Sequence, residues 1–107
     1  MTDRHILVLG GFDGVSSLDT TEILDLGTMQ FTPGPQMCTR RRGCAAVLLD
    51  HGLLIVVGGI AEGNTRLDST DILNFATMIF CSGPRMVIKR SACAAARLDQ
   101  HRVIVVG

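Results

Sequence analysis

Two glycine pairs follow runs of apolar residues, a spacing with which a phosphate-binding turn could begin. The pairs end the segments "LVLGG" (7–11) and "LLIVVGG" (53–59). In dinucleotide-binding folds such a turn leads directly into a helix, whose N-terminus binds the phosphate. Here the next regular segments are "TTEILDL" (20–26) and "STDILNF" (69–75), whose Thr and Ile content is typical of strands. We therefore expect the glycines to end strands, where positive φ and a missing Cβ let the chain turn.

Residues that could act as nucleophiles, acid–base groups or metal ligands lack the spacing that such chemistry needs. The cysteines contain no C-x-x-C pair, and the histidines lie beside turns without partners at ligand spacing. Asp19, Asp25 and Asp50 lie in loops or at strand ends, where Asp accepts hydrogen bonds from local backbone N–H groups. General acid–base pairing is the weaker alternative. We predict no catalytic residue, no metal site and no cofactor. The cysteines and histidines are Cys38, Cys44, Cys81, Cys93, His5, His51 and His101.

The composition predicts one small soluble domain. The chain has 107 residues, of which 47% are hydrophobic, and ten Lys and Arg balance ten Asp and Glu, for a formal net charge of +0. A neutral chain lacks the basic surface that binds nucleic acid or an anionic membrane. No apolar segment has the length of a membrane span or of a secretory signal. The cysteines are interpreted as small apolar residues in a reducing compartment, and we expect a cytoplasmic protein.

The sequence contains an internal repeat of about 49 residues. Gly10, Gly58 and Gly107 end successive copies of one apolar segment, and the steps between them are 48 and 49 residues. Between residues 19–58 and 68–107, 20 of 40 aligned pairs are identical, whereas average composition gives roughly one match in fifteen. A pattern that recurs at fixed spacing indicates architecture before it indicates an active site. The predicted units within 1–107 are approximately 5–53 and 54–102, with 103–107 beginning a third.

Each unit is predicted to form four short strands. The segment "LLIVV" (53–57) is continuously apolar, as in a strand that is buried on both faces. Strands in "STDILNF" (69–75) and "MIFC" (78–81) follow it, and "SACAAARLD" (91–99) has the small side chains that suit the crowded inner ring of a propeller. Four strands repeated in tandem describe a propeller blade. The sequence therefore predicts an all-β fold, an incomplete β-propeller of roughly two four-stranded antiparallel blades.

A large residue lies seven positions before an aromatic residue in both units, Leu24 before Phe31 and Leu73 before Phe80. Together with the glycine pair and the methionine and arginine that follow, this order resembles the kelch repeat over almost the whole chain. Family repeats usually have Tyr and Trp at these positions, and this chain contains neither. The copper oxidases of the family depend on tyrosine ligands, so the resemblance does not imply their chemistry here. We expect Phe31 and Phe80 to be buried between blades.

The resemblance also implies that two sets of loops open on one face and contact a peptide partner. In this chain they are residues 12–17 and 60–66, and residues 39–42 and 88–91. The loops differ between the units while the strands match, as expected where loops serve recognition. Guanidinium groups pair bidentately with carboxylates, which favours an acidic peptide, and a solvated basic turn is the alternative for each residue. Because Arg41 and Arg90 repeat, bracing of the turn is an equal alternative for them. The candidate partner-binding residues are Arg40, Arg41, Arg42, Arg66, Lys89, Arg90, Ser16 and Asn64.

The resemblance implies a protein-interaction module, such as the substrate-recognition or scaffold part of a larger adaptor, because family members fill that role in ubiquitin ligases or on actin. The alternative is a fragment of a propeller enzyme whose catalytic residues lie in absent blades. The expected strands supply three of one blade, four of the next and two of a third, which cannot close a ring. The apolar faces of the terminal blades would then favour self-association or membership of a longer propeller. Residues 6–11 and 103–107 are the same strand of the repeat and would compete for one place.

Overall fold

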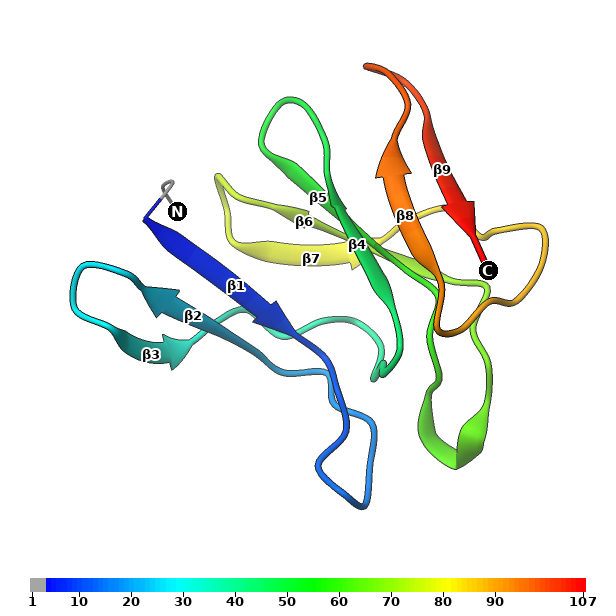
Figure 1. Cartoon of the computed structure of the whole chain (residues 1–107), viewed down its shortest axis with the longest axis horizontal. Coiled ribbons are helices and arrows are strands. Elements are labelled where there is room, and N and C mark those ends of the chain that lie inside the picture. The colour runs from blue at the N-terminus through cyan, green and yellow to red at the C-terminus, as the bar shows by residue number, and fades with distance from the viewer. Residues whose placement is uncertain (1–3) are drawn as a thin grey trace.

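The computed structural model describes residues 4–107 as an all-β chain with three antiparallel sheets. The sheets follow one another along the chain and lie side by side in that order (Figure 1). The first sheet contains β1 (His5–Leu9), β2 (Thr21–Asp25) and β3 (Gln30–Pro33); the second contains β4 (Ala45–Leu48), β5 (Leu53–Val57), β6 (Thr70–Asn74) and β7 (Ile79–Ser82); the third contains β8 (Ala94–Arg97) and β9 (Val103–Val106).

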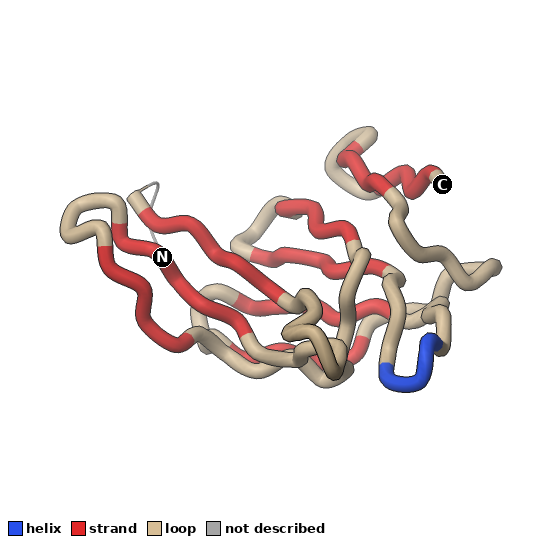
Figure 2. The backbone as a smooth tube through the Cα atoms, turned by 60° about the horizontal axis from the view of Figure 1, so that its bottom comes forward, coloured by secondary structure: helices blue, strands red, loops and turns tan. Residues whose placement is uncertain are grey.

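The predicted distribution of strands over three blades is confirmed, with three, four and two strands in the successive sheets of residues 4–107. The sheets are out of phase with the sequence repeat. The predicted unit 5–53 runs from β1 of the first sheet to β4 of the second, and the unit 54–102 runs from β5 of the second sheet to β8 of the third, so each unit joins two neighbouring sheets. One turn of 3-10 helix, η1 (Glu62–Asn64), lies in the loop between β5 and β6 (Figure 2). Within the part of the chain that the structure describes, no helix is long and apolar enough to cross a membrane.

Equivalent strands use equivalent pairings. Leu24 of β2 lies opposite Phe31 of β3, and Leu73 of β6 lies opposite Phe80 of β7. The alanine-rich strands β4 and β8 pair with β5 and β9 in matching registers and lie beside each other at the boundary of the second and third sheets. Their small side chains allow this close approach, as the sequence predicts for an inner strand.

The core lies between the first and second sheets. Val56, Leu73 and Phe80 of the second sheet are buried, with Phe80 only 7% exposed. Leu7 and Leu9 of β1 pack against this cluster. The side chain of Phe80 therefore fills the space between two blades, and the expectation for this residue is confirmed.

The corresponding expectation for Phe31 is wrong, because Phe31 is 55% exposed. Phe31 lies on the face of the first sheet that no other described sheet covers, together with Ile6 and Val8. Val8 is 47% exposed, whereas its repeat equivalent Val56 is 0% exposed. The same residue type is thus buried or exposed according to whether a preceding sheet is present.

The glycine pairs end β1 and β5 and turn the chain, as predicted. Gly10 and Gly58 have φ values of +65° and +64°, a region that L side chains rarely adopt. An added Cβ would lie 2.6 Å from the carbonyl oxygen of Arg41 at Gly10, and 2.5 Å from that of Arg90 at Gly58. Both positions need glycine because the backbone of the segment before the next sheet passes close to them.

Candidate functional site

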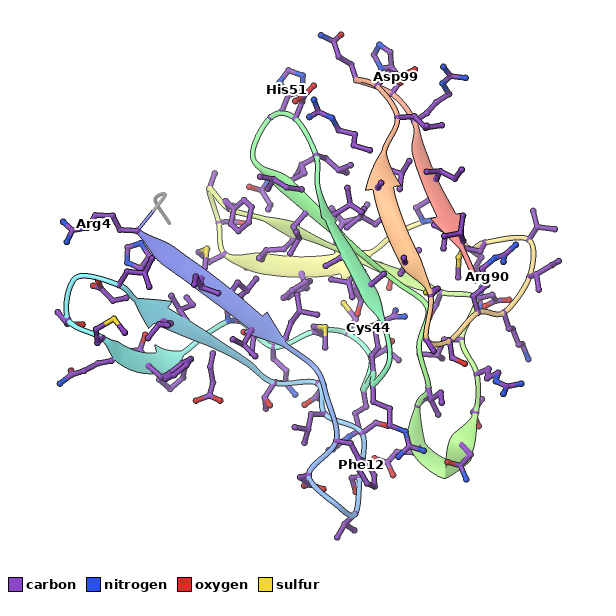
Figure 3. All side chains as sticks on the ribbon, viewed as in Figure 1. Arg4, Phe12, Cys44, His51, Arg90 and Asp99 are labelled. Carbon is purple, nitrogen blue, oxygen red and sulfur yellow. The ribbon has the colours of Figure 1, made fainter. Side chains whose placement is uncertain are left out.

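The loops between β1 and β2 and between β5 and β6 lie at the same end of the sheets as the segment 39–42. We call residues 12–17, 39–42 and 60–66 the loop face. Phe12 lies at this end, whereas His51 and Asp99, in the turns before β5 and β9, lie at the opposite end (Figure 3). The loop face therefore contains one of the two predicted loop sets complete, 12–17 with 60–66, and half of the other.

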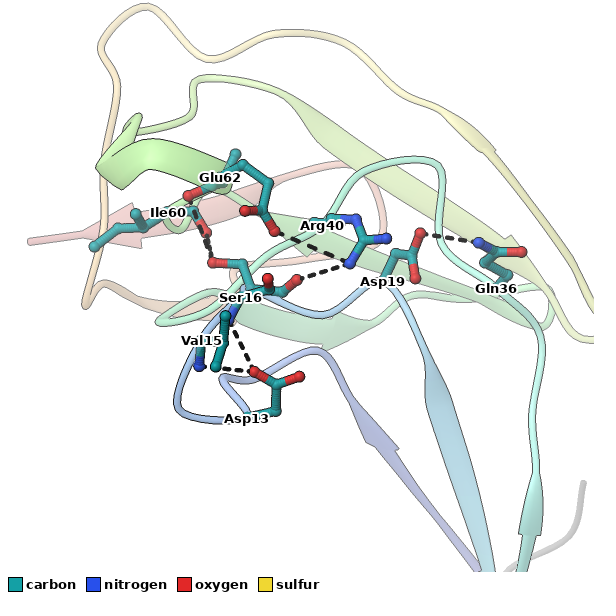
Figure 4. A network of polar contacts seen from close by, with 10 residues as sticks. Asp13, Val15, Ser16, Asp19, Gln36, Arg40, Ile60 and Glu62 are labelled. Carbon is teal, nitrogen blue, oxygen red and sulfur yellow. Dashed lines mark hydrogen bonds and ion pairs between the residues drawn. The ribbon is translucent and has the colours of Figure 1, made fainter.

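Residues 12–17 form a tight loop around one carboxylate (Figure 4). The Oδ1 atom of Asp13 accepts hydrogen bonds from the backbone N–H of Val15 at 2.9 Å and of Ser16 at 2.8 Å. These bonds, led by that from Ser16, lower the pKa of Asp13 from its ordinary value of 3.8. A backbone bridge between Phe12 and Ser17 closes the loop. Ser16 therefore shapes the loop through its backbone.

The loop of the second sheet is joined directly to that of the first. Ser17 Oγ donates a hydrogen bond to the carbonyl oxygen of Ile60 at 2.9 Å. Ile60 also forms backbone bridges with Arg42 and Arg66. The chain then turns through η1, where Asn64 has a φ of +62°. One hydroxyl group and these backbone bridges thus hold the two loops at a fixed separation.

Arg42 is the central side chain of the loop face. Its guanidinium carbon lies 4.3 Å from the centroid of the Phe12 ring, the geometry of a cation–π contact. Its Nη2 atom donates a hydrogen bond to Oδ1 of Asn64. A cavity of about 280 Å³ opens beside these three side chains. It is lined by Phe12, Val15, Ser17, Arg42, Ala61, Glu62, Gly63 and Asn64.

Arg40 and Arg66 add positive charge at the same face. Arg40 Nη1 donates to the carbonyl oxygen of Ser17 at 3.3 Å and lies 4.0 Å from Oε1 of Glu62 (Figure 4). The side chains of Arg40 and Glu62 are both about half exposed, so this ion pair is weak. Arg66 is exposed, and within residues 4–107 its side chain has no hydrogen bond or ion pair.

Arg41 does not reach the surface. It is 0% exposed, and its Nη1 atom donates to the carbonyl oxygens of Gly58 and Ser69, both at 2.9 Å. Its Nη2 atom donates to Ser69 Oγ at 3.0 Å, and its Nε atom lies 3.4 Å from Oδ2 of Asp71. Of the two alternatives for Arg41, the structure shows the bracing one. Partner binding was the wrong assignment for this residue, because its donors are used inside the protein.

Lys89 and Arg90 lie at the next junction, between the second and third sheets. Lys89 is exposed. Arg90 Nη1 donates to the carbonyl oxygen of Gly107 at 2.7 Å, the contact that Arg41 makes with Gly58. Figure 3 shows Arg90 beside the C-terminus and well separated from Phe12. The structure therefore brings Arg40, Arg42, Arg66, Ser16 and Asn64 together, and it places Lys89 and Arg90 elsewhere.

Several residues of the loop face were not singled out from the sequence, among them Phe12, Ser17 and Glu62. Phe12 follows the first glycine pair directly, and an aromatic residue in a polar loop is a signal that could have identified it. Ser17 and Glu62 contact Ile60 and Arg40 across the two loops. No sequence signal identifies these two, because their contacts depend on how neighbouring sheets are placed.

The cysteines do not contribute a reactive thiol to this face. All four are free, and Cys44 and Cys93 are partly buried at equivalent positions. Burial raises the pKa of the Cys44 thiol, and desolvation likewise raises the pKa of Cys38. Both thiols are thus kept in the protonated form, which is the poorer nucleophile. Among residues 4–107, no three His, Cys, Asp or Glu side chains gather as metal ligands.

Comparisons with known proteins agree with this architecture. Residues 1–37 match the family model described as the Kelch motif. Among solved structures, a "Novel fungal alcohol oxidase with catalytic diversity among the AA5 family, in complex with copper" is similar, with a TM-score of 0.77 and 22% sequence identity over 88% of this chain. This chain spans 22% of the length of that oxidase, and the likeness concerns the fold alone. A search of curated proteins gave no match.

The sheets and their connections define a segment of a β-propeller, and the first 37 residues carry a kelch motif. The predicted all-β fold of antiparallel propeller blades is confirmed.

Proposed function

We propose that this chain is a protein-interaction module whose loop face binds an acidic segment of a partner. The proposal rests on the placement of Arg42. Its guanidinium carbon lies 4.3 Å from the centroid of the Phe12 ring and beside a cavity of about 280 Å³. The ring and Asn64 hold the guanidinium in one position. A pre-positioned guanidinium loses less conformational entropy when it binds a carboxylate, so it supports recognition.

The charges of the loop face also support an acidic ligand. Arg40, Arg42 and Arg66 are opposed by Asp13 and Glu62. The Asp13 carboxylate already accepts two backbone hydrogen bonds within its own loop. Oε1 of Glu62 lies 4.0 Å from Nη1 of Arg40 in an exposed ion pair. A ligand carboxylate can therefore replace the Glu62 carboxylate at little cost in free energy. The arginines are therefore the groups with unused donor capacity.

The wider role that we propose is substrate recognition or scaffolding within a larger, non-enzymatic adaptor of the cytoplasm, such as a ubiquitin ligase receptor. Kelch repeats generally mediate protein–protein interaction, and residues 1–37 match this motif. The loops differ more between the two repeat units than the strands do, which further supports recognition by the loops. We also propose that the chain associates with itself through its uncovered blade faces.

The second candidate is a segment of a propeller enzyme. The similarity to the fold of a copper-containing alcohol oxidase favours it. Catalytic residues would then have to come from other blades, since this chain has no tyrosine for the ligand role that the family's copper oxidases require. A coding sequence in which further blades supply tyrosine and histidine would favour the enzyme, and an adaptor domain would favour the interaction module.

Charge reversal at two arginines tests the interaction module. Binding of a fluorescent Glu-rich peptide, with a Lys-rich peptide as its counterpart, is measured by anisotropy for the full chain. We expect preference for the Glu-rich peptide and a loss of about tenfold or more in affinity for R42E/R66E. Arg102→Glu is the matched control, because Arg102 pairs with Asp99 at the opposite end of the sheets. Equal binding of both peptides, or equal loss in the control, would contradict the proposal.

A further inference from the structure

The cavity of the loop face has an acidic residue in its wall as well as an arginine. Arg42 and Glu62 both line it, and Oε1 of Glu62 lies 4.0 Å from Nη1 of Arg40 (Figure 4). The Glu62 side chain is 55% exposed, so solvent screens its charge only in part. An anion that enters the cavity therefore meets one group that attracts it and one group that repels it.

The backbone holds Glu62 at this wall. Glu62 begins the single turn η1, across which the N–H of Ala61 donates a hydrogen bond to the carbonyl oxygen of Thr65 at 2.7 Å. Asn64, at the end of the same turn, accepts a hydrogen bond from Arg42 and ties the turn to the opposite loop. A ligand that displaces the Glu62 carboxylate from its ion pair consequently leaves the negative charge beside the cavity.

The guanidinium group of Arg42 has donors that are not yet used. Among the hydrogen bonds of residues 4–107, this group makes one, from Nη2 to Oδ1 of Asn64. Its other N–H groups suit the two oxygens of a carboxylate, because a guanidinium binds a carboxylate with two parallel hydrogen bonds. A phosphate group offers the same pair of acceptors. Hydrogen bonding by itself therefore does not distinguish the two anions.

The charge of the loop face does distinguish them. Arg41 is paired with Asp71 inside the protein, and the remaining charged groups are three arginines and two acids, for a net charge of +1. A carboxylate carries one negative charge and balances this surface. A phosphate monoester carries about −1.5 to −2 at pH 7 and leaves excess negative charge beside Glu62. The five groups are Arg40, Arg42, Arg66, Asp13 and Glu62.

The apolar part of the cavity wall adds to this selection. Phe12, Val15 and Ala61 contribute side chains to it. A doubly charged phosphate loses more hydration free energy beside apolar groups than a singly charged carboxylate does. The methylene groups of a glutamate side chain, in contrast, gain free energy from contact with apolar surface. Charge and hydration thus favour the same anion.

We propose that Glu62 determines the specificity of the loop face, so that the cavity selects a carboxylate side chain of a partner and rejects a phosphorylated one. Glu62 acts through its charge and not through a hydrogen bond to the ligand. Removing that charge raises the net charge of the loop face from +1 to +2, which suits a doubly charged phosphate. The inference rests on the proposed function, because it names the anion that the same cavity binds.

Two peptides that differ only in their anionic groups test the proposal. One is the fluorescent Glu-rich peptide, and in the other phosphoserine replaces each glutamate. Binding to the full chain is measured by anisotropy at about pH 7.5, where the phosphate is mostly doubly charged. We expect the Glu-rich peptide to bind about threefold or more tightly, because the extra charge is repelled by Glu62. Non-specific attraction to basic residues predicts the opposite order, since the phosphoserine peptide is the more negative.

Three variants isolate the charge of Glu62. Glu62→Gln should strengthen binding of the phosphoserine peptide more than that of the Glu-rich peptide and remove the preference. Glu62→Asp keeps the charge and should retain the preference. Glu22→Gln makes the same chemical change at an exposed position of β2, outside the loop face, and should behave like wild type. Equal strengthening of both peptides by Glu62→Gln would overturn the selective role of Glu62.

Acid gives a readout that a purely structural role of Glu62 would not change. The second pKa of a phosphate monoester is about 6, whereas the Glu-rich peptide stays ionised above about pH 5. No histidine lies in residues 12–17, 39–42 or 60–66. Binding of the phosphoserine peptide to wild type should therefore strengthen from about pH 7.5 to about pH 5.5, and it should not strengthen in Glu62→Gln. The same pH profile in both proteins would contradict the proposal.

Failure of this inference is distinguishable from failure of the proposed function. Equal binding of the Glu-rich and Lys-rich peptides by wild type would overturn the proposed function, and the selection by Glu62 with it. Preference for the Glu-rich over the Lys-rich peptide, together with tighter binding of the phosphoserine peptide to wild type, would overturn the selection by Glu62 alone.

Discussion

Arg41 and Asp71 form an ion pair at 3.4 Å that is almost completely buried, with exposed fractions of 0% and 1%. The pair lies at the boundary of the first and second sheets, and three further hydrogen bonds satisfy the guanidinium. A buried charge pair is maintained only when its hydrogen-bonding capacity is used in this way. The contact therefore fixes the position of one blade relative to the next.

Removing one partner of this pair should destabilise the chain strongly. Arg41→Ala leaves the Asp71 carboxylate buried without its counter-ion, and we expect a loss of about 3–5 kcal/mol in the free energy of unfolding. Urea denaturation followed by circular dichroism measures this change. Arg85→Ala serves as a control, because the Arg85 side chain is 74% exposed and its pair with Asp68 lies at the surface. A similar small change in both variants would show that the buried pair does not position the blades.

The two equivalent phenylalanines should respond differently to truncation. Phe80→Ala removes a ring that is 7% exposed and leaves a cavity between the sheets, at a cost of about 3–5 kcal/mol. Phe31→Ala removes a ring that is 55% exposed, and its cost should be below about 1 kcal/mol in the monomer. Equilibrium unfolding of both variants at low concentration gives the comparison. Equal losses would mean that Phe31 is covered in solution.

The strands and their order could be predicted from the sequence because each strand pattern occurs twice at equivalent positions. A pattern too short to be decisive once is convincing when it recurs. The pairing of Leu24 with Phe31 and of Leu73 with Phe80 follows from one pattern that occurs twice. Burial could not be predicted in the same way, since it depends on whether another sheet is present. Phe31 and Phe80 lie at equivalent positions of the repeat, and their different exposure depends on whether another sheet covers them.

The candidate site was predicted at the level of loops more accurately than at the level of side chains. Arg40, Arg41 and Arg42 are consecutive, and composition cannot distinguish them. Backbone bridges of Arg41 to Leu18 and of Arg42 to Ile60 turn successive side chains in different directions. Arg41 consequently enters the protein, whereas its neighbours remain at the loop face. The cation–π contact with Phe12 likewise depends on tertiary placement.

The second glycine of each pair provides a matched test of backbone approach. Gly11 and Gly59 have φ values of +109° and +101°, so alanine is strained at both. An added Cβ at Gly59 would lie 2.6 Å from the carbonyl oxygen of Arg42, whereas at Gly11 no atom beyond the adjacent residues of the chain would lie within 4 Å of it. Gly59→Ala should therefore lower the thermal midpoint more than Gly11→Ala. A larger effect at Gly11 would contradict the close approach of the segment 39–42 to β5.

Acid should release the loop that Asp13 organises. The pKa of this carboxyl is lowered from 3.8 because the N–H groups of Ser16 and Val15 donate to its charged form. A lowered pKa in the folded state means that the carboxylate stabilises the loop above the unfolded value, and that this contribution is lost as pH falls through the folded value. In ¹H–¹⁵N NMR spectra, the Val15 and Ser16 amide resonances should therefore shift together, with a midpoint below 3.8. Asp13→Asn should abolish that transition while the rest of the spectrum is retained. A midpoint at or above the ordinary value would show that these hydrogen bonds do not persist in solution.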